Sequence, residues 1–166
     1  MAGKKSLESR KSTLKEVNES INEKGDKIKQ LEDSYDKAYD KRMEVENDDN
    51  IDDEVKNAYR EKSAETLRGF IEKGKDAAND LNKELNKLKE LKQENDEAIK
   101  ANAEGKKRAE AMDKAASERN IESNTAEKFV SHDEVLNKFG GEIGDAKKQV
   151  EALQKSAGNL KRFRDS

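Results

Sequence analysis

Apolar residues separated alternately by four and three positions run through the middle of this chain, and this spacing constrains the fold more than any other feature. Residues spaced in this way form a narrow seam along one side of an α-helix, while the remaining positions of each heptad here are mostly Lys, Glu, Asp and Asn. A seam this narrow has to be covered by another helix, from this chain or from a second one. Its members are Leu67, Ile71, Gly74, Ala78, Leu81, Leu85, Leu88 and, after the polar Lys92 and Asn95, Ile99.

The composition is compatible with only two classes of protein. Hydrophobic residues make up 31% of the chain and charged residues 44%, which is typical of disordered chains and of long-helix proteins. A disordered segment has no reason to keep its apolar residues at heptad spacing, so the periodicity favours helices. Proline is absent, which permits uninterrupted helices, and aromatic residues are only 4%, which argues against a sheet.

A second seam precedes the first. It predicts a helix over 6–46, with Arg10 and Lys24 as polar members, and the acidic stretch 46–53 then predicts a tight turn because Asp and Asn favour turns and helix N-termini. The long helix that follows is predicted over 53–119. The apolar members of the second seam are Leu7, Leu14, Val17, Ile21, Ile28, Leu31, Tyr35, Ala38 and Val45.

The last helix is predicted over 131–163, after a polar loop at 119–131. Ser131 and Glu134 have the spacing of a capping box, directly before the most regular apolar series in the chain. We therefore expect a single all-α domain over 1–166, built as an elongated antiparallel helical hairpin or coiled coil of about three long helices. Heptads specify pairing better than they specify which copy pairs, so a homodimer fits the seams as well as a single chain does.

Several functional classes find no support in the residues. Charge is balanced along most of the chain, with 35 basic and 38 acidic residues, whereas a nucleic-acid-binding protein usually has a sustained basic surface. No convergent acid, base or nucleophile set is visible, so we predict no enzyme, no catalytic residue, no metal and no cofactor. No apolar run is long enough for an integral membrane segment and no apolar signal region follows the basic start, so we expect a cytoplasmic protein or one exported without a cleavable signal peptide.

The outline of two comparable helices folded back on each other, in a small acidic chain without Cys, resembles the helical-hairpin proteins of bacterial type VII secretion, the WXG and LXG-like proteins. Leu67-Arg68-Gly69 reads as an LXG tripeptide, here inside the heptads of the long helix, and the chain has no Trp. The resemblance covers about residues 5–100 in architecture. It implies a secreted heterodimer partner or a chaperone that presents a toxin to the secretion machinery.

The seams themselves lead to the functional prediction. We expect a non-enzymatic interaction protein that binds a partner helix, with an adaptor or chaperone role for a secreted toxin as the role that the resemblance implies. The alternative is a structural coiled-coil spacer or self-assembling scaffold. If the long helix does not already cover it, the seam of the last helix is the predicted partner-binding surface, and its residues are Leu136, Phe139, Ile143, Val150, Leu153 and Leu160.

Overall fold

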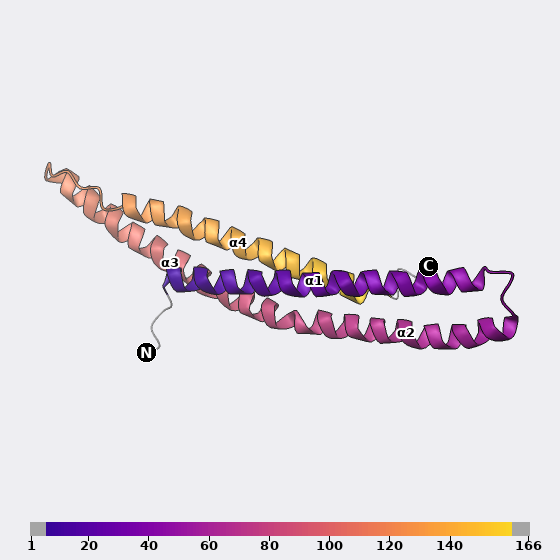
Figure 1. Ribbon diagram of the computed structural model, residues 1–166. Helices are drawn as coiled ribbons and strands as arrows, with labels where there is room; N and C mark the ends of the chain where they lie inside the picture. The colour runs from indigo at the N-terminus through magenta and orange to yellow at the C-terminus, as the bar shows by residue number, and fades with distance from the viewer. Residues whose placement is uncertain (1–5, 161–166) are drawn as a thin grey trace. The chain divides into compact units, whose positions relative to one another are not determined.

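The computed structural model describes residues 6–160, and within that range it consists of helices joined by turns, with no strand (Figure 1). The prediction of an all-α protein is confirmed. The predicted end of the last helix at 163 lies outside the described residues. The four helices are α1 (Leu7–Glu46), α2 (Asp53–Asp80), α3 (Asn82–Glu118) and α4 (Glu127–Gly158).

These helices contribute to two compact units. The first unit comprises the chain up to Val17 together with Asn86–Lys148, and the second comprises Asn18–Leu85 together with the chain from Gln149 onward. α1, α3 and α4 each pass from one unit into the other. Each unit is therefore built from helical segments that are distant in the sequence.

In the second unit, α1 and α2 form the antiparallel hairpin that the acidic stretch predicts. The turn lies between Glu46 and Asp53, and the Asn50 N–H donates to the Asp48 carboxylate at 2.9 Å. Asp53 and Glu54 occupy the first turn of α2, where the helix dipole favours negative charge. The end of α4 completes the core of this unit, whose buried apolar residues are Ile21, Ile28, Tyr35, Leu67, Leu81, Val150, Ala157 and Leu160.

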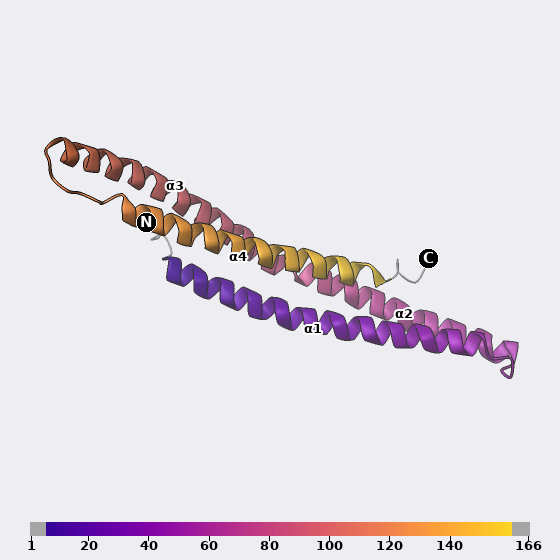
Figure 2. The same cartoon turned by 90° about the horizontal axis from the view of Figure 1, so that it is seen from above.

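In the first unit, α3 and α4 form a second antiparallel hairpin, and the first turns of α1 add to it (Figure 2). Both views show that α1 begins well short of the loop that joins α3 to α4. Near that loop, α3 and α4 therefore pack on each other without α1. The buried apolar residues of this unit are Leu14, Val17, Leu88, Leu91, Ala109, Leu136, Phe139, Ile143 and Ala146.

The single long helix predicted over 53–119 is wrong in one respect, because α2 ends at Asp80 and α3 begins at Asn82. Leu81 between them is fully buried and keeps helical backbone angles, with φ −67° and ψ −17°. Its N–H still donates to the Ala77 carbonyl at 3.2 Å. The interruption is thus confined to one turn.

The predicted start of the last helix at Ser131 is also wrong, since α4 begins at Glu127. The signal that was missed lies upstream of the predicted capping box. The N–H groups of Thr125 and Ala126, directly before α4, donate to the Asp113 carboxylate at 3.0 Å, and the Asn124 side chain donates to the Glu127 carboxylate at 2.7 Å. Phe129, half-buried against α3, anchors the additional turn.

Candidate functional site: the α3 seam and its polar neighbours

Most of the predicted partner-binding residues of α4 lie in the core. Leu136, Phe139 and Ile143 in the first unit are at most 2% exposed, and in the second unit Val150 is 0% and Leu160 7% exposed. Only Leu153 is half-buried. The α4 seam is therefore covered within this chain, and it forms no exposed docking surface.

Leu153 borders a shallow groove between α1 and α4 in the second unit. A Cβ placed on Gly25 would lie 3.4 Å from Leu153 Cδ1, which is ordinary van der Waals contact. Across the same groove, Gln149 donates to the Asn22 side chain at 3.3 Å. The groove has a volume of about 430 Å³, and its rim is mostly polar. Leu153 thus lies at the edge of the contact between α1 and α4.

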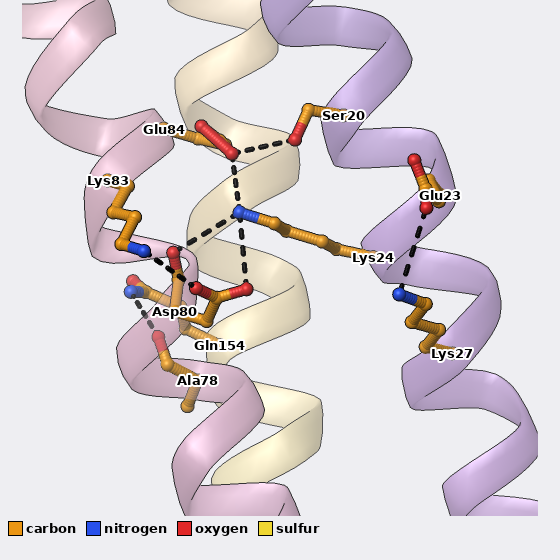
Figure 3. Close-up of polar contacts among 9 residues, drawn as sticks. All are labelled: Ser20, Glu23, Lys24, Lys27, Ala78, Asp80, Lys83, Glu84 and Gln154. Atoms are coloured by element: carbon orange, nitrogen blue, oxygen red, sulfur yellow. Dashed lines mark hydrogen bonds and ion pairs between the residues drawn. The ribbon is translucent and has the colours of Figure 1, made fainter.

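A polar cluster lies inside the second unit, at the junction of α2 and α3 (Figure 3). Glu84 of α3 is 3% exposed, although its position next to Leu85 in the heptad gave no reason to expect burial. The Ser20 hydroxyl donates to Glu84 Oε1 at 2.7 Å, and Lys24 Nζ donates to the same oxygen. Lys24 Nζ also lies 3.3 Å from Asp80 Oδ2. The polar seam residue Lys24 is thereby matched by carboxylates on the facing helices.

The same cluster explains the interruption between α2 and α3. Gln154 from α4 donates to the Ala78 carbonyl at 3.0 Å and to Asn82 Oδ1 at 2.7 Å. Lys24 from α1 donates to the Asp80 carbonyl at 3.4 Å. Side chains that insert at backbone carbonyls in this way kink helices, and Asn and Asp have low helix propensity.

The cluster shifts the protonation of its charged members. Burial by itself lowers the pKa of Lys24, but the hydrogen bonds to Glu84 and Asp80 and the charges of both carboxylates outweigh it, so that the pKa of Lys24 is raised. The hydrogen bond from Lys24 lowers the pKa of Asp80. Both groups are therefore held in their charged forms at neutral pH.

Asparagine side chains join α3 to α4 in the first unit. Asn95 is 1% exposed, and its Nδ2 donates to the Leu136 carbonyl at 3.0 Å. Nearer the connecting loop, Asn102 Nδ2 donates to the Phe129 carbonyl at 2.8 Å. A Cβ on Gly105 would lie 2.6 Å from the Phe129 ring, so any larger residue here would force the ring to move. These contacts fix the pairing of the two helices.

Asp113 holds the connecting loop against α3. Its carboxylate accepts hydrogen bonds from the Ser123 hydroxyl at 2.6 Å, from the Ala126 N–H at 3.0 Å and from the Thr125 hydroxyl at 2.7 Å and N–H at 3.0 Å. These bonds hold the pKa of Asp113 well below its usual range. α3 itself closes at Asn120, whose φ of 58° is left-handed, and the Ile121 N–H bonds back to the Ala116 carbonyl at 2.8 Å.

Beside the buried series Leu88, Asn95, Asn102 and Ala109, a second heptad row of α3 becomes exposed toward this loop. Residues at seven-residue steps along α3 are Leu91, Ala98, Gly105 and Met112, which we call the α3 row. Leu91 is 2% exposed, Ala98 and Gly105 are half-buried, and Met112 is 63% exposed. The row therefore begins in the core and ends in solvent.

Exposed apolar side chains gather around the same end of the first unit. Five large hydrophobic side chains are exposed among the described residues, and four of them belong to this hairpin. Met112 is on α3, Ile121 in the loop, and Val130 and Val135 on the first turns of α4. Single exposed apolar residues are ordinary, so the informative feature is their gathering at one hairpin end.

Arg10, the other polar member of the α1 seam, is buried in the first unit with an exposed fraction of 6%. Among the residues that the structure describes, neither its Nε nor its Nη1 has a hydrogen-bond partner. Arg10 lies two heptads before Lys24, and the residue two heptads after Glu84 is Ala98. Lys24 faces the carboxylate of Glu84, whereas the equivalent position for Arg10 holds Ala98, which has no carboxylate.

The fold and these contacts define an all-α protein whose buried polar groups serve helix pairing. No group of three His, Cys, Asp or Glu residues in the range 6–160 is placed to hold a metal ion, and no helix in that range is long and apolar enough to cross a membrane. No protein-family model matches this chain, and neither a curated protein nor a solved structure matches it.

Proposed function

We propose that this protein is a non-enzymatic interaction protein that binds a partner helix along the α3 row, next to the α3–α4 loop. The observation that carries the proposal is the loss of cover along one heptad row, from Leu91 at 2% exposed to Met112 at 63% exposed. A seam at heptad spacing is stabilised when a second helix packs on it. α1 begins well short of the α3–α4 loop, so it does not extend along this end of α3 (Figures 1 and 2).

The remainder of the hairpin supports a preformed docking surface. Asn102 and Asp113 hold α3, α4 and the loop together by contacts within the hairpin, and the Phe129 ring of α4 packs beside Gly105, so the exposed end of the row at Met112 belongs to a structured element. A partner helix would add the third helix that α1 supplies deeper in the unit. Binding then requires no opening of the buried α4 seam.

The test uses a synthetic amphipathic peptide of about three heptads with Leu and Ala at the seam positions, titrated into the full chain. We expect binding to slow hydrogen exchange over 98–112, and Met112→Asp to abolish it because a charge would enter the apolar contact. Ala111→Asp, on the exposed neighbouring position, is the matched control. Equal binding to all three proteins would refute the proposed surface.

An adaptor or chaperone role for a secreted toxin belongs to the same proposal, with the resemblance of the Leu67-Arg68-Gly69 tripeptide and the hairpin outline in its support. Leu67 is buried at 6% exposed, and a Cβ added at Gly69 would meet no atom within 4 Å. The tripeptide therefore contributes one core residue to the α1–α2 hairpin. Co-expression with a candidate toxin and measurement of its soluble yield would test this role.

The alternative function is that of a structural spacer or self-assembling scaffold. The burial of the α4 seam within the chain favours the spacer role, because a chain with a covered seam has few apolar residues left to offer to a partner. Light scattering over a range of protein concentrations separates the two functions. A mass that grows beyond two chains favours the scaffold, whereas a constant mass of one chain favours a protein that binds a different partner.

A further inference from the structure

The charged residues of α3 are distributed unevenly around the helix. An α-helix turns by about 100° per residue, so the positions one and four before each residue of the α3 row lie within about 100° of the row, on one side of it. Over 90–111 these positions hold two alanines, a single cation and four glutamates, which are Arg108 and Glu90, Glu94, Glu97 and Glu104. The lysines of this part of α3 all lie at other positions, and they are Lys89, Lys92, Lys100, Lys106 and Lys107.

The glutamates lie on the side of the α3 row that faces away from α4. Asn102, which bonds to α4, comes four residues after the row residue Ala98. Glu97 comes one residue before Ala98, on the opposite side of the row. Glu90, Glu97 and Glu104 repeat this position at seven-residue steps, and we call them the acidic row. A helix that packs on the α3 row would thus have α4 along one edge and the acidic row along the other.

The carboxylates of the acidic row have no partner within the described part of the chain. All three side chains are exposed, and none of them forms a hydrogen bond or an ion pair there. Elsewhere on α3, Lys92 lies 2.9 Å from the Asp96 carboxylate, and Lys106 lies 3.9 Å from that of Glu110. Both of these lysines pair away from the acidic row. The edge beside the proposed docking surface therefore keeps negative charge that α3 does not balance.

A basic helix against these carboxylates would repeat a contact that occurs inside the chain. In the second unit, α1 packs on the beginning of α3 and brings Lys24 to the carboxylates of Glu84 and Asp80. From these features we infer that the partner helix carries Lys or Arg along the edge that lies over Glu97 and Glu104. The inference rests on the proposed docking along the α3 row and adds the chemistry of the partner to it.

The partner that fits this edge is a helix of another protein. Two copies of this chain that paired through their α3 rows would use the same face of both chains, about a two-fold axis. The two acidic rows would then lie side by side, where like charges repel. The α4 seam is covered within each chain, so it is not free to serve as the partner helix. A helix of another protein with a Lys or Arg edge avoids both obstacles.

Two peptides test the inference on the full chain. Both are amphipathic helices of about three heptads with Leu and Ala at the seam positions, and they differ only at the positions that border the seam, which are Lys in one and Gln in the other. Because both edges carry Lys, either direction of binding places Lys over the acidic row. By fluorescence anisotropy we expect the Lys peptide to bind about fivefold more tightly at low salt and less than about twofold more tightly at about 0.5 M salt, since exposed ion pairs are weak and screened.

Charge reversal separates a local contact from the net charge of the protein. Glu97→Lys with Glu104→Lys is expected to reverse the preference, so that the Gln peptide binds more tightly at low salt. The matched control is Asp96→Lys with Glu110→Lys. It changes the net charge equally, at exposed positions on the far side of α3, and should keep the preference for the Lys peptide. Circular dichroism establishes that both double variants keep their helical content.

The outcomes are distinct. Equal affinities of the two peptides for the unsubstituted protein at low salt, or a preference that Asp96→Lys with Glu110→Lys also reverses, would overturn the basic-partner inference while the docking surface stood. Failure of both peptides to bind, or binding that Met112→Asp leaves unchanged, would overturn the proposed function as well. A two-chain mass in light scattering that Met112→Asp reduces to one chain would identify a second copy as the occupant and contradict the inference. Tighter binding of the Lys peptide to a Lys4→Gln, Lys5→Gln variant would show that the chain's own first residues compete for the acidic row, which would contradict it too.

Discussion

Lys24 Nζ of α1 donates a hydrogen bond to the carboxylate of Glu84, which is 3% exposed, so a charged pair stands where a heptad seam normally carries apolar side chains. Removing one member of such a pair is costly, because the other charge remains buried. We expect Lys24→Met to lower the free energy of unfolding by about 2–4 kcal/mol, measured by urea denaturation.

The double variant Lys24→Met with Glu84→Leu is the informative companion. Replacing both charges by apolar side chains removes the desolvation cost together with the attraction, so we expect stability close to that of the original protein. Lys27→Met serves as the control, because the Lys27 pair with Glu23 is exposed on both sides. A single Lys24→Met variant as stable as the control would contradict the account of this cluster.

Replacing either of two glycines of α2 by alanine should change the stability of the protein, but in opposite directions. A Cβ on Gly74 would lie 2.6 Å from the backbone oxygen of Ala157, whereas a Cβ on Gly69 would meet nothing within 4 Å. We expect Gly74→Ala to destabilise the protein by about 1–3 kcal/mol through this clash. Gly69→Ala should stabilise it by up to about 1 kcal/mol, since alanine favours a helix. Thermal unfolding of both variants checks the prediction, and a shift of the same sign in both would contradict it.

Asp113 predicts a pH dependence at the α3–α4 loop. Its hydrogen bonds to Ser123, Ala126 and Thr125 hold its pKa below the usual range in the folded protein. Its contribution to stability is thus complete above the ordinary aspartate pKa of about 4 and is lost as the pH falls below that value. We expect Asp113→Asn to raise hydrogen exchange at 125–130 at neutral pH and to flatten the acid limb of the stability profile.

A carboxyl chemical-shift titration checks this prediction directly. The Asp113 signal should titrate well below the ordinary aspartate pKa of about 4. Titration of Asp113 at that ordinary value would show that the hydrogen bonds at the loop do not hold in solution.

Replacing Arg10 should stabilise the isolated protein, because its buried guanidinium has two nitrogens without a hydrogen-bond partner among the described residues. Arg10→Met removes a buried guanidinium whose Nε and Nη1 have no partner among the described residues, and retains most of the apolar stem. We expect the free energy of unfolding to rise by about 1–3 kcal/mol. Lys11→Met, at an exposed position, should change it little. Loss of stability in Arg10→Met would mean that Arg10 is paired in solution.

The sequence predicted the class of the fold because the heptads and the acidic turn are local signals. The helix over 6–46 and the reversal before Asp53 depend only on the residues that form them, and both are confirmed within one residue. The interruption at Leu81 was missed because it arises from Gln154 and Lys24, which approach from other helices. Tertiary contacts of this kind have no counterpart in the local pattern.

The candidate site was less predictable than the fold. The regular series from Leu136 to Leu160 marks residues that need a partner helix, but a heptad pattern does not distinguish a partner within the chain from one outside it. Met112 is not a member of the seam that runs from Leu67 to Ile99, and its exposed fraction of 63% became known only from the packed structure. The sequence showed that Arg10 is a polar member of its seam. Only the structure showed that Arg10 is buried and that no carboxylate pairs with it.

The central claim is that the α4 seam is closed while the α3 row is open at Met112, and cysteine labelling measures both directly. The chain contains no cysteine, so Met112→Cys and Ile143→Cys each introduce a single thiol. Under native conditions we expect the thiol at 112 to react at nearly the rate of an unfolded chain and the thiol at 143 to react roughly a hundredfold more slowly, through local opening. Equal rates at the two positions would contradict the account, since they would mean that the α4 seam is as accessible as the α3 row.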